Sequence, residues 1–325
     1  MLNSSNVSKL SIAPMMDLTD RHCRYFLRLL SPHAMLYTEM VTAAALIHGN
    51  AAALLQFNVE EHPVALQLGG SDPRMMAEAA RMGEAEGYDE ININVGCPSD
   101  RVQSGQFGAC LMARPELVAS CVSSMTAAIK VPVTVKTRIG IDDLESYEFL
   151  CRFVEIVSAA GCGTFVVHAR KAILAGLSPK ENRSVPPLDH ERVYRLKKDY
   201  PSLHIVLNGG ITTSEQVEHH LHGVDGVMIG RQAYQDPWFL TVLETSLYGT
   251  PEIDRAAVME QISEYIERQL HQGVALKHMT RHLLGLYNGE PGARQWRRSL
   301  SENAHRPGAG IEVLRNAMRS LHKAA

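Results

Sequence analysis

Short apolar runs alternate with amphipathic segments along most of this chain. About eight runs have the length and residue types of buried strands, namely residues 10–13, 35–41, 64–68, 91–95, 133–136, 164–168, 204–207 and 226–229. Helical periodicity lies between most of them, as at 72–86, 115–129, 144–160 and 213–222. Strands that alternate with helices pair in parallel, and eight such strands close a barrel. The sequence therefore predicts an α/β fold, a parallel (β/α)8 TIM barrel.

Two local features complete this prediction. Thr19 is expected to cap the first helix, and Thr212 or Thr213 the helix that follows the seventh strand. A doubly wound open sheet is the structural alternative, but the GxGxxG turn expected after its first strand is missing.

The last part of the chain has a different pattern. No strand-like run follows Trp238, and from about residue 251 apolar residues recur only at helical spacing, as at Val258, Ile262 and Ile266. We therefore predict a catalytic barrel over residues 1–245 and a small all-helical domain over residues 246–325.

Positive charge gathers in this helical part. Nine lysines and arginines but only three acidic residues follow Leu276, whereas the whole chain has a net charge of −3. Arg294, Arg297 and Arg298 flank Trp296, which would suit phosphate contacts beside an aromatic platform for a base. Solvated arginines around a core tryptophan are the plainer interpretation.

The composition is that of a globular protein with a large core, since 45% of the 325 residues are hydrophobic and 21% are charged. The net charge argues against a uniformly basic nucleic-acid binder. No apolar run has the length of a membrane span, and the N-terminus lacks the order of a secretory signal, so a cytoplasmic protein is expected. The six cysteines form no CxxC pair, so neither a metal site nor a disulfide framework is predicted.

One cysteine lies where a barrel would have its active site. In the segment 89–112, Ile91, Ile93 and Val95 alternate with asparagines before the turn that carries Cys97. The C-terminal ends of barrel strands carry active sites, and the glycines that follow allow close approach of a ligand. Cys97 is therefore a candidate catalytic residue, with an inert buried thiol as the alternative.

Polar and glycine residues follow the other strands as well, and in a barrel they would share one rim. The set includes Pro14, Met15, Met16, Gln67, Asn94, Lys136, Arg138, His168, Asn208, Gly209, Gly210, Gly230 and Arg231. Glycine loops after the last two strands often bind phosphate, and an inward lysine usually has a charged ligand because an unpaired buried ammonium is costly. A plain turn at the glycines and a core histidine at His168 are the alternatives.

These motifs resemble those of the tRNA-dihydrouridine synthases, flavoenzymes that reduce uridines in the D loop of tRNA. The resemblance spans nearly the whole chain and rests on APMMDLTD, NVGCPSDRVQSGQFGACLM, VKTRIG, VVHAR, LNGGI and IGR. The segment 168–188, HARKAILAGLSPKENRSVPPL, is similar to the A subfamily, which acts on uridines 20 and 20a.

The resemblance implies a role for each motif. Residues similar to FMN contacts are Pro14, Met15, Met16, Gln67, Lys136 and His168, and residues similar to the phosphate-binding loops are Asn208, Gly209, Gly210, Gly230 and Arg231. Cys97 corresponds to the proton donor and Asn94 to a contact of the flipped-out uridine. Lys180, Arg183, Arg297 and Arg298 correspond to tRNA contacts, and Arg138 would stabilise charge on the substrate with Lys136.

The implied reaction uses NADPH to reduce FMN, and then passes hydride to uracil C6 and a proton from Cys97 to C5. The uridine must leave its stack to reach the barrel. A neutral thiol suits this proton donor, and an ordinary cysteine pKa of about 8.5 provides one. A monomer is expected. The alternatives are a flavin barrel like dihydroorotate dehydrogenase that acts on a free pyrimidine, and a non-catalytic RNA-binding barrel.

Overall fold

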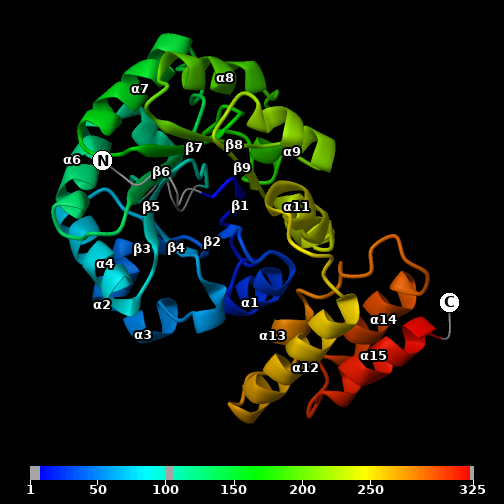
Figure 1. The fold of residues 1–325 in the computed structure, drawn as a ribbon. Coiled ribbons are helices and arrows are strands. Elements are labelled where there is room, and N and C mark those ends of the chain that lie inside the picture. Colours follow the sequence, from blue (N-terminus) through cyan, green and yellow to red (C-terminus); the bar gives the residue numbers. More distant parts are fainter. Residues whose placement is uncertain (1–7, 100–104, 323–325) are drawn as a thin grey trace. The chain divides into compact units, whose positions relative to one another are not determined.

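The computed structural model describes residues 8–99 and 105–322, and parallel strands close into a barrel there (Figure 1). The ring consists of β1 (Leu10–Ile12), β2 (Met35–Tyr37), β4 (Val64–Gly69), β5 (Glu90–Val95), β6 (Val133–Arg138), β7 (Thr164–His168), β8 (His204–Asn208) and β9 (Gly226–Ile229). Strand β1 pairs with both β2 and β9, and β2 pairs with β4, so the sheet closes on itself. The predicted (β/α)8 barrel is confirmed.

Helices surround these strands, as Figure 1 shows. They are α2 (Ala43–His48), α3 (Ala51–Leu54), α4 (Pro73–Glu86), α6 (Pro115–Thr126), α7 (Tyr147–Ala159), α8 (His190–Asp199) and α9 (Ser214–Leu221). Short 3-10 helices occur at η1 (Val59–Glu61), η2 (Gly108–Ala113) and η3 (Glu181–Arg183). Each long helix begins where the sequence offers a starting signal, for example Asp72 as N-cap and Pro73 as first residue of α4.

Two local predictions need correction. The run 35–41 is not one strand, because β2 ends at Tyr37 and a separate two-residue strand, β3 (Val41–Thr42), pairs with β4. Thr19 does not cap the first helix; the Asp20 carboxylate accepts the N–H groups of His22 and Cys23 instead. Asp is at least as good an N-cap as Thr, and the next residue in the chain was the better candidate. Thr213 does cap α9 as expected.

The pleat of the strands separates apolar from polar side chains. Ile91 and Leu66 lie against α4, where a Cβ on Gly83 would come within 2.7 Å of both. The neighbours in sequence, Gln67 and Asn92, hydrogen-bond to each other across two strands and are buried. The barrel interior therefore holds a polar cluster, besides an apolar one formed by Ala13, Tyr37, Ala65, Val166, Val206 and Met228.

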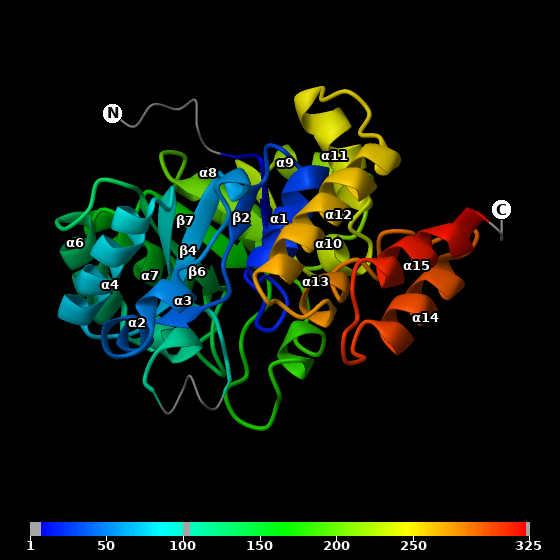
Figure 2. The ribbon, with the colours of Figure 1, turned by 90° about the horizontal axis from the view of Figure 1, so that it is seen from below.

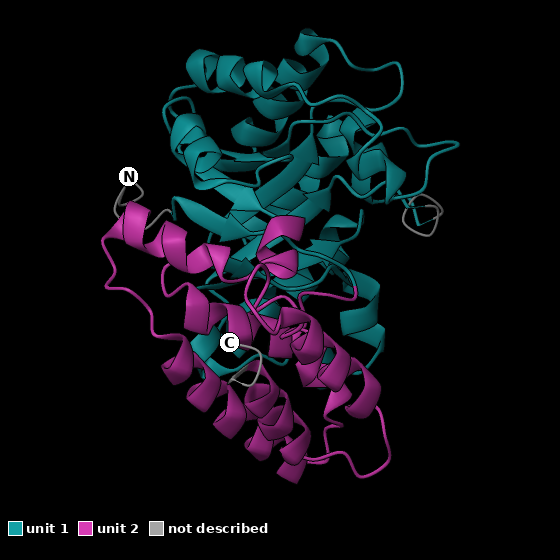
Figure 3. Cartoon of the chain, turned by 90° about the vertical axis from the view of Figure 1, so that its right-hand side faces the viewer, with its two compact units in different colours: residues 1–16, 34–230 teal, residues 17–33, 231–325 magenta. Residues whose placement is uncertain are grey.

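The chain divides into two compact units, coloured separately in Figure 3. Unit 1 comprises residues 1–16 and 34–230, and unit 2 comprises residues 17–33 and 231–325. Unit 2 thus includes α1 (Arg21–Leu30), which lies between the first two barrel strands in sequence. The boundary between the predicted catalytic and tRNA-binding domains at residue 245 stays a prediction, because the compact units meet at other positions in the chain.

Within its described residues, unit 2 contains helices and connecting loops but no strand. Besides α1 it contains α10 (Arg231–Gln235), α11 (Phe239–Tyr248), α12 (Arg255–His271), α13 (Lys277–Thr280), α14 (Ala293–Asn303) and α15 (Glu312–His322). Helices α14 and α15 lie side by side (Figure 2). The Tyr25 ring of α1 stacks on Tyr265 of α12 with centroids 3.9 Å apart, so α1 shares the core of this unit. In the described residues no helix has the length and apolarity needed to cross a membrane.

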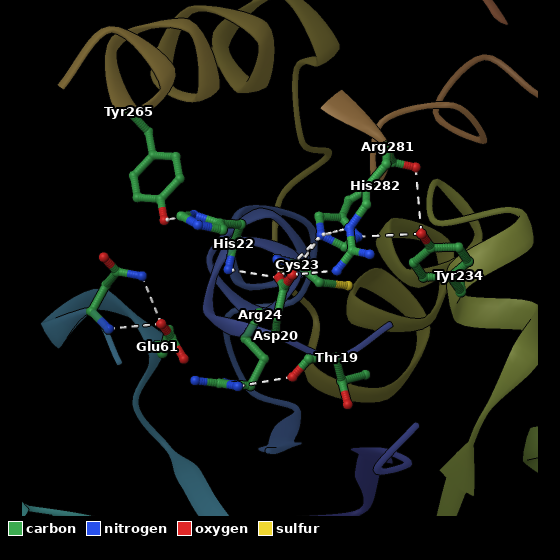
Figure 4. Close-up of polar contacts among 11 residues, drawn as sticks. Thr19, Asp20, His22, Cys23, Arg24, Glu61, Tyr234, Tyr265, Arg281 and His282 are labelled. Atoms are coloured by element: carbon green, nitrogen blue, oxygen red, sulfur yellow. Dashed lines mark hydrogen bonds and ion pairs between the residues drawn. The ribbon is translucent and has the colours of Figure 1, made fainter. Parts of the chain in front are cut away.

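A charged cluster joins α1 to the segment after α13 within unit 2 (Figure 4). The Asp20 carboxylate accepts hydrogen bonds from Arg281 Nη2 at 2.5 Å and contacts His282 Nε2 at 3.0 Å. Burial alone would raise the pKa of Asp20, but His282, the Cys23 N–H and Arg281 together hold it below its ordinary value. Buried His22, beside Tyr265, has its pKa lowered to about 4, chiefly by burial.

Replacing the charge at this cluster should destabilise unit 2. We expect Asp20→Asn to lower the free energy of unfolding by about 2 kcal/mol at pH 6, because Arg281 and His282 lose the charged acceptor of their hydrogen bonds. Since the folded pKa of Asp20 lies below the unfolded value of about 3.9, its contribution is full above about pH 4 and is lost as the pH falls further. Urea unfolding at pH 6 and pH 3 measures both effects.

The matched control is Asp254→Asn. Asp254 caps α12 in the same unit through the N–H groups of Ala256 and Ala257. Asparagine is as good an N-cap as aspartate, so this variant should cost less than about 0.5 kcal/mol. Equal losses in the two variants would show that the Asp20 ion pairs add nothing beyond helix capping.

Candidate active site at the rim of the barrel

The Cys97 turn follows β5 and is held through its backbone. Asn94 Oδ1 accepts the N–H groups of Gly96 at 3.1 Å and Cys97 at 2.9 Å, and Ala109 N donates to the Cys97 carbonyl at 2.9 Å. The thiol is half-buried, with Sγ 3.6 Å from Ser99 Oγ. The turn is therefore preorganised by its own strand and by η2. Residues 100–104 of the predicted segment lie outside the described residues.

Arg138 holds the same turn from the neighbouring strand. Its Nε donates to the Gly96 carbonyl at 2.8 Å, and its Nη1 donates to the carbonyls of Lys171 and Asn182 at 3.0 Å each. Burial lowers the pKa of Arg138 to about 10. The charge of Cys97 acts against this shift, whereas the positive charges of Arg183 and Arg170 add to it. The guanidinium thus fastens the cysteine turn to the loop after β7.

That loop, residues 169–189, is built around a side chain that sequence reasoning missed. Asn182 is fully buried, accepts the N–H of Ile173 and donates to the carbonyls of Ile173, Leu177 and Ser178. The predicted contacts Lys180 and Arg183, on either side of it, are exposed. Asn182 thus holds the loop through its backbone, while the exposed cations on either side are suited to phosphate contacts.

Lys136 also reaches the rim. Its Nζ donates to Asn208 Oδ1 at 3.0 Å, while Asn208 Nδ2 donates to the Met228 carbonyl at 2.8 Å. Burial, with a smaller effect of the Arg138 charge, lowers the pKa of Lys136 to about 7, and an ionised Cys97 would oppose that shift. Lys136 pairs with Asn94 in the register of β5 and β6, and Arg138 bonds to Gly96, so both cations lie beside the Cys97 turn. An anionic ligand here would favour the ammonium form.

The glycine pair after β8 packs against His168 without side chains of its own. Gly209 and Gly210 have φ of +116° and +77°, which favour glycine. A Cβ on Gly209 would lie 2.6 Å from His168 Cδ2, and one on Gly210 would lie 2.4 Å from Leu188 Cδ1. The His190 ring nitrogen Nε2 lies 2.9 Å from the Gly209 carbonyl and keeps the turn in place. His168, Asn208, Gly209 and Gly210 are therefore brought together as predicted.

The first and last strands complete the rim. Gly230 follows β9, where an added Cβ would have its nearest neighbours at Ala13 Cβ, 3.7 Å, and Met15 Sδ, 4.0 Å. Pro14 and Met15 are half-buried and Met16 is 55% exposed. Arg231 is exposed and is the first residue of α10 and of the second segment of unit 2.

The remaining predicted site residues form a buried amide pair. Gln67 Oε1 accepts from Asn94 Nδ2 at 2.8 Å, and Gln67 Nε2 donates to Asn92 Oδ1 at 2.8 Å. With both lone pairs of Asn94 Oδ1 taken by the Cys97 turn, Asn94 has one N–H left for a ligand. Gln67 likewise retains one N–H and one lone pair.

Sequence reasoning missed the partners behind this pair. Asn92, Thr134 and Glu90 are buried and hydrogen-bonded in the barrel interior. The polar alternation of β5 carried a signal for Asn92 and Glu90, whereas Thr134 resembles any strand threonine.

In unit 2, the prediction that Trp296 forms an aromatic platform for a base is wrong. Trp296 is 0% exposed and its Nε1 donates to the Leu283 carbonyl, so it is a core residue and cannot stack on a base. Arg297 and Arg298 are exposed on α14, and Arg298 pairs with Glu302 at 2.9 Å. The six cysteines are free, and the described residues contain no group of three side chains suited to holding a metal ion.

Comparison with known proteins gives relatives for nearly the whole chain. Residues 11–322 match the family model of dihydrouridine synthase. A tRNA-dihydrouridine(20/20a) synthase of Vibrio cholerae is 58% identical over 96% of this chain and 96% of its own length. The Escherichia coli K12 protein of the same name is 59% identical over 96% of this chain and 91% of its own length.

One solved structure supports the fold alone. A 2-naphthoyl-CoA reductase in complex with 2-naphthoyl-CoA superposes with a TM-score of 0.58 at 11% sequence identity. The match covers 75% of this chain and 50% of that chain.

A methyl group at the glycine turn should disturb the site. We expect Gly209→Ala to lower the free energy of unfolding by about 3 kcal/mol, because it combines backbone strain with a clash against His168. Gly176→Ala is the control, since Gly176 has φ of +87° in the same unit but nothing within 4 Å of an added Cβ. Chemical unfolding measures the loss of stability in both variants. If Gly209→Ala loses no more stability than Gly176→Ala, the His168 ring moves aside without penalty and the clash does not contribute.

Proposed function

Because this chain belongs to the dihydrouridine synthase family, we propose that it is an enzyme that reduces uridine in tRNA to 5,6-dihydrouridine at its barrel rim. The observation that carries the proposal is the Cys97 turn, which Asn94 and Arg138 hold and which lies beside Lys136. The proposed positions in the D loop are 20 and 20a, because the relatives from Vibrio cholerae and Escherichia coli carry these numbers in their names.

The rim residues suit FMN as the cofactor. The glycine pair at Gly209 and Gly210 leaves room that a Cβ would fill, and its N–H groups suit a phosphate. Pro14, Met15 and Met16 would pack against the ring system, His168 would flank it, and Gln67 would offer it an N–H donor. Lys136 would contact the polar edge of the ring system. Asn208, Gly230 and Arg231 would contact the phosphate. When bound, FMN would take hydride from NADPH and supply it to uracil.

The chain's own residues would then bind the base and deliver a proton. The uridine must leave its stack to enter the barrel, and the remaining Asn94 N–H would meet a carbonyl oxygen of the uracil ring. Cys97 would donate its thiol proton to C5. Lys136 and Arg138 would stabilise negative charge that develops on the base. These groups come from neighbouring strands, so the barrel holds them in a fixed geometry.

The tRNA would be held by cations outside the barrel interior. Lys180 and Arg183 on the loop after β7, and Arg297 and Arg298 on α14, are the proposed phosphate contacts. The helical part, residues 246–325, is the proposed tRNA-binding domain. With a tRNA substrate and all site residues in one chain, we expect a monomer that works in the cytoplasm.

Two alternatives make different predictions. A barrel that acts on a free pyrimidine would reduce uracil or orotate without tRNA, and it gives no reason for the exposed cations of α14. A non-catalytic RNA-binding barrel would contain no flavin. Flavin absorbance of the purified protein and mapping of dihydrouridine in tRNA from cells with and without this protein distinguish the three.

Removal of the Cys97 thiol should slow the reduction of uridine but not the binding or the reduction of FMN. We expect Cys97→Ala to bind FMN and to be reduced by NADPH as the wild type is, but to form dihydrouridine at least about 100-fold more slowly. The control is Cys110→Ala, because Cys110 is also half-buried near the turn and donates only to the Phe107 carbonyl. Stopped-flow flavin spectra and nucleoside analysis separate the steps, and full product formation by Cys97→Ala would remove this residue from the mechanism.

If Arg297 contacts a phosphate of tRNA, its removal should reduce the salt dependence of tRNA binding. We expect Arg297→Ala to weaken tRNA binding several-fold and to reduce the slope of log K against log salt by about 1. The control is Arg152→Ala on α7, an exposed arginine that pairs with Glu116. Deleting the residues after about 250 is a poorer test, because α12 contributes Tyr265 to the core around α1. An unchanged salt slope for Arg297→Ala would remove it from the interface.

A further inference from the structure

A chain of buried hydrogen bonds runs along the barrel interior from Glu90, at the start of β5, to the Cys97 turn after its end. Thr134 Oγ1 donates to Glu90 Oε1 at 2.6 Å, and Asn92 Nδ2 donates to Thr134 Oγ1 at 2.8 Å. From Asn92 the chain continues through Gln67 and Asn94 to the backbone. Glu90 is 8% exposed and the other four side chains are no more exposed than that. None of these groups can exchange a lost partner for bulk water.

Every bond in this chain points the same way. The N–H groups of Gly96 and Cys97 donate to Asn94, and each following side chain donates toward Glu90. Backbone N–H groups can only donate, and the Glu90 oxygen accepts from Thr134 and from Tyr37 as well. Both ends therefore impose one direction, and the orientation of the three amides between them follows.

This direction matters because amide groups have two unlike ends. If the chain ran the opposite way, Asn94 would turn its NH2 group toward two backbone N–H groups, and the Cys97 turn would lose both bonds. Asn94 and Gln67 would then also present different atoms to a ligand at the rim. A single acceptor at the first residue of β5 can thus control the groups beside the thiol at the other end of the same strand.

We propose that Glu90 is a positioning residue for the reaction at Cys97, acting through Thr134, Asn92, Gln67 and Asn94. The proposal rests on the proposed function for its catalytic consequence, but its structural consequence can be measured separately. Glu90 touches neither the thiol nor the proposed ligands. It acts by keeping the amides in the one orientation that holds the turn and leaves an Asn94 N–H free.

The chain offers a matched pair of variants. Thr134→Val preserves shape and removes the link between Glu90 and Asn92. Tyr37→Phe also removes a hydroxyl that donates to Glu90 Oε1, at 2.7 Å, but this hydroxyl lies outside the path to Cys97. Each variant removes one hydrogen bond to the same carboxyl group, and Thr134→Val also removes the acceptor of Asn92 Nδ2, which is the link under test. If Glu90 only needed its own hydrogen bonds filled, the two variants would have equal effects on the Cys97 turn.

The first measurement needs no cofactor or substrate. Residue-resolved hydrogen exchange of the folded protein reports the N–H groups of Gly96 and Cys97. We expect Thr134→Val and Glu90→Leu to speed their exchange about tenfold, the factor that corresponds to one lost hydrogen bond. Tyr37→Phe should stay within about twofold of the wild type. Glu90→Gln, which keeps an acceptor oxygen, should restore slow exchange.

The second measurement is dihydrouridine formation by the FMN-loaded variants. We expect Thr134→Val to lower kcat about tenfold with little change in KM for tRNA, while Tyr37→Phe and Glu90→Gln retain kcat. Exchange and kcat that are equal in Thr134→Val and Tyr37→Phe would overturn the proposal, as would wild-type exchange in Thr134→Val. If the wild type forms no dihydrouridine, the proposed function fails, and the exchange data still decide whether Glu90 positions the turn.

Discussion

A polar side chain inside a closed barrel must find its hydrogen bonds there, and this constraint shapes the site. Five polar side chains from β4, β5 and β6 meet in the interior, where no water compensates for a missing partner. These side chains can all form their hydrogen bonds only as one series, with a donor group at one end and an acceptor group at the other. The reactive turn forms the donor end, so the packing of the barrel and the position of Cys97 depend on the same bonds.

Arg138 extends this dependence to the loop after β7. Its guanidinium is used on three backbone carbonyls, which come from the cysteine turn and from the loop that carries Lys180 and Arg183. A lysine could not make these bonds, because it lacks the planar fork of donors. The turn that holds the proposed proton donor and the loop with proposed tRNA contacts are therefore fixed by one side chain.

Much of this arrangement could be predicted from the sequence. The period of two in β5 separated Ile91 and Ile93 from Asn92 and Asn94, and the parallel barrel then placed the strand ends at one rim. Apart from the run 35–41, the strand bounds were predicted to within two residues, because polar residues, Gly and Pro interrupt the apolar pattern. The roles of Glu90 and Thr134 could not be predicted, because their pairing depends on the register between β5 and β6 rather than on either strand alone.

Unit 2 shows the same limit at a longer range. The helical periodicity of the last segment was plain, yet nothing local indicated that α1, some 230 residues earlier, shares its core. Tyr25 and Asp20 look like ordinary residues of a first barrel helix until Tyr265, Arg281 and His282 are placed beside them. Trp296 failed as a base platform for a related reason, since flanking arginines are compatible with either a buried or an exposed ring. Sequence spacing predicts which face a residue lies on, whereas its partner is decided by the tertiary structure.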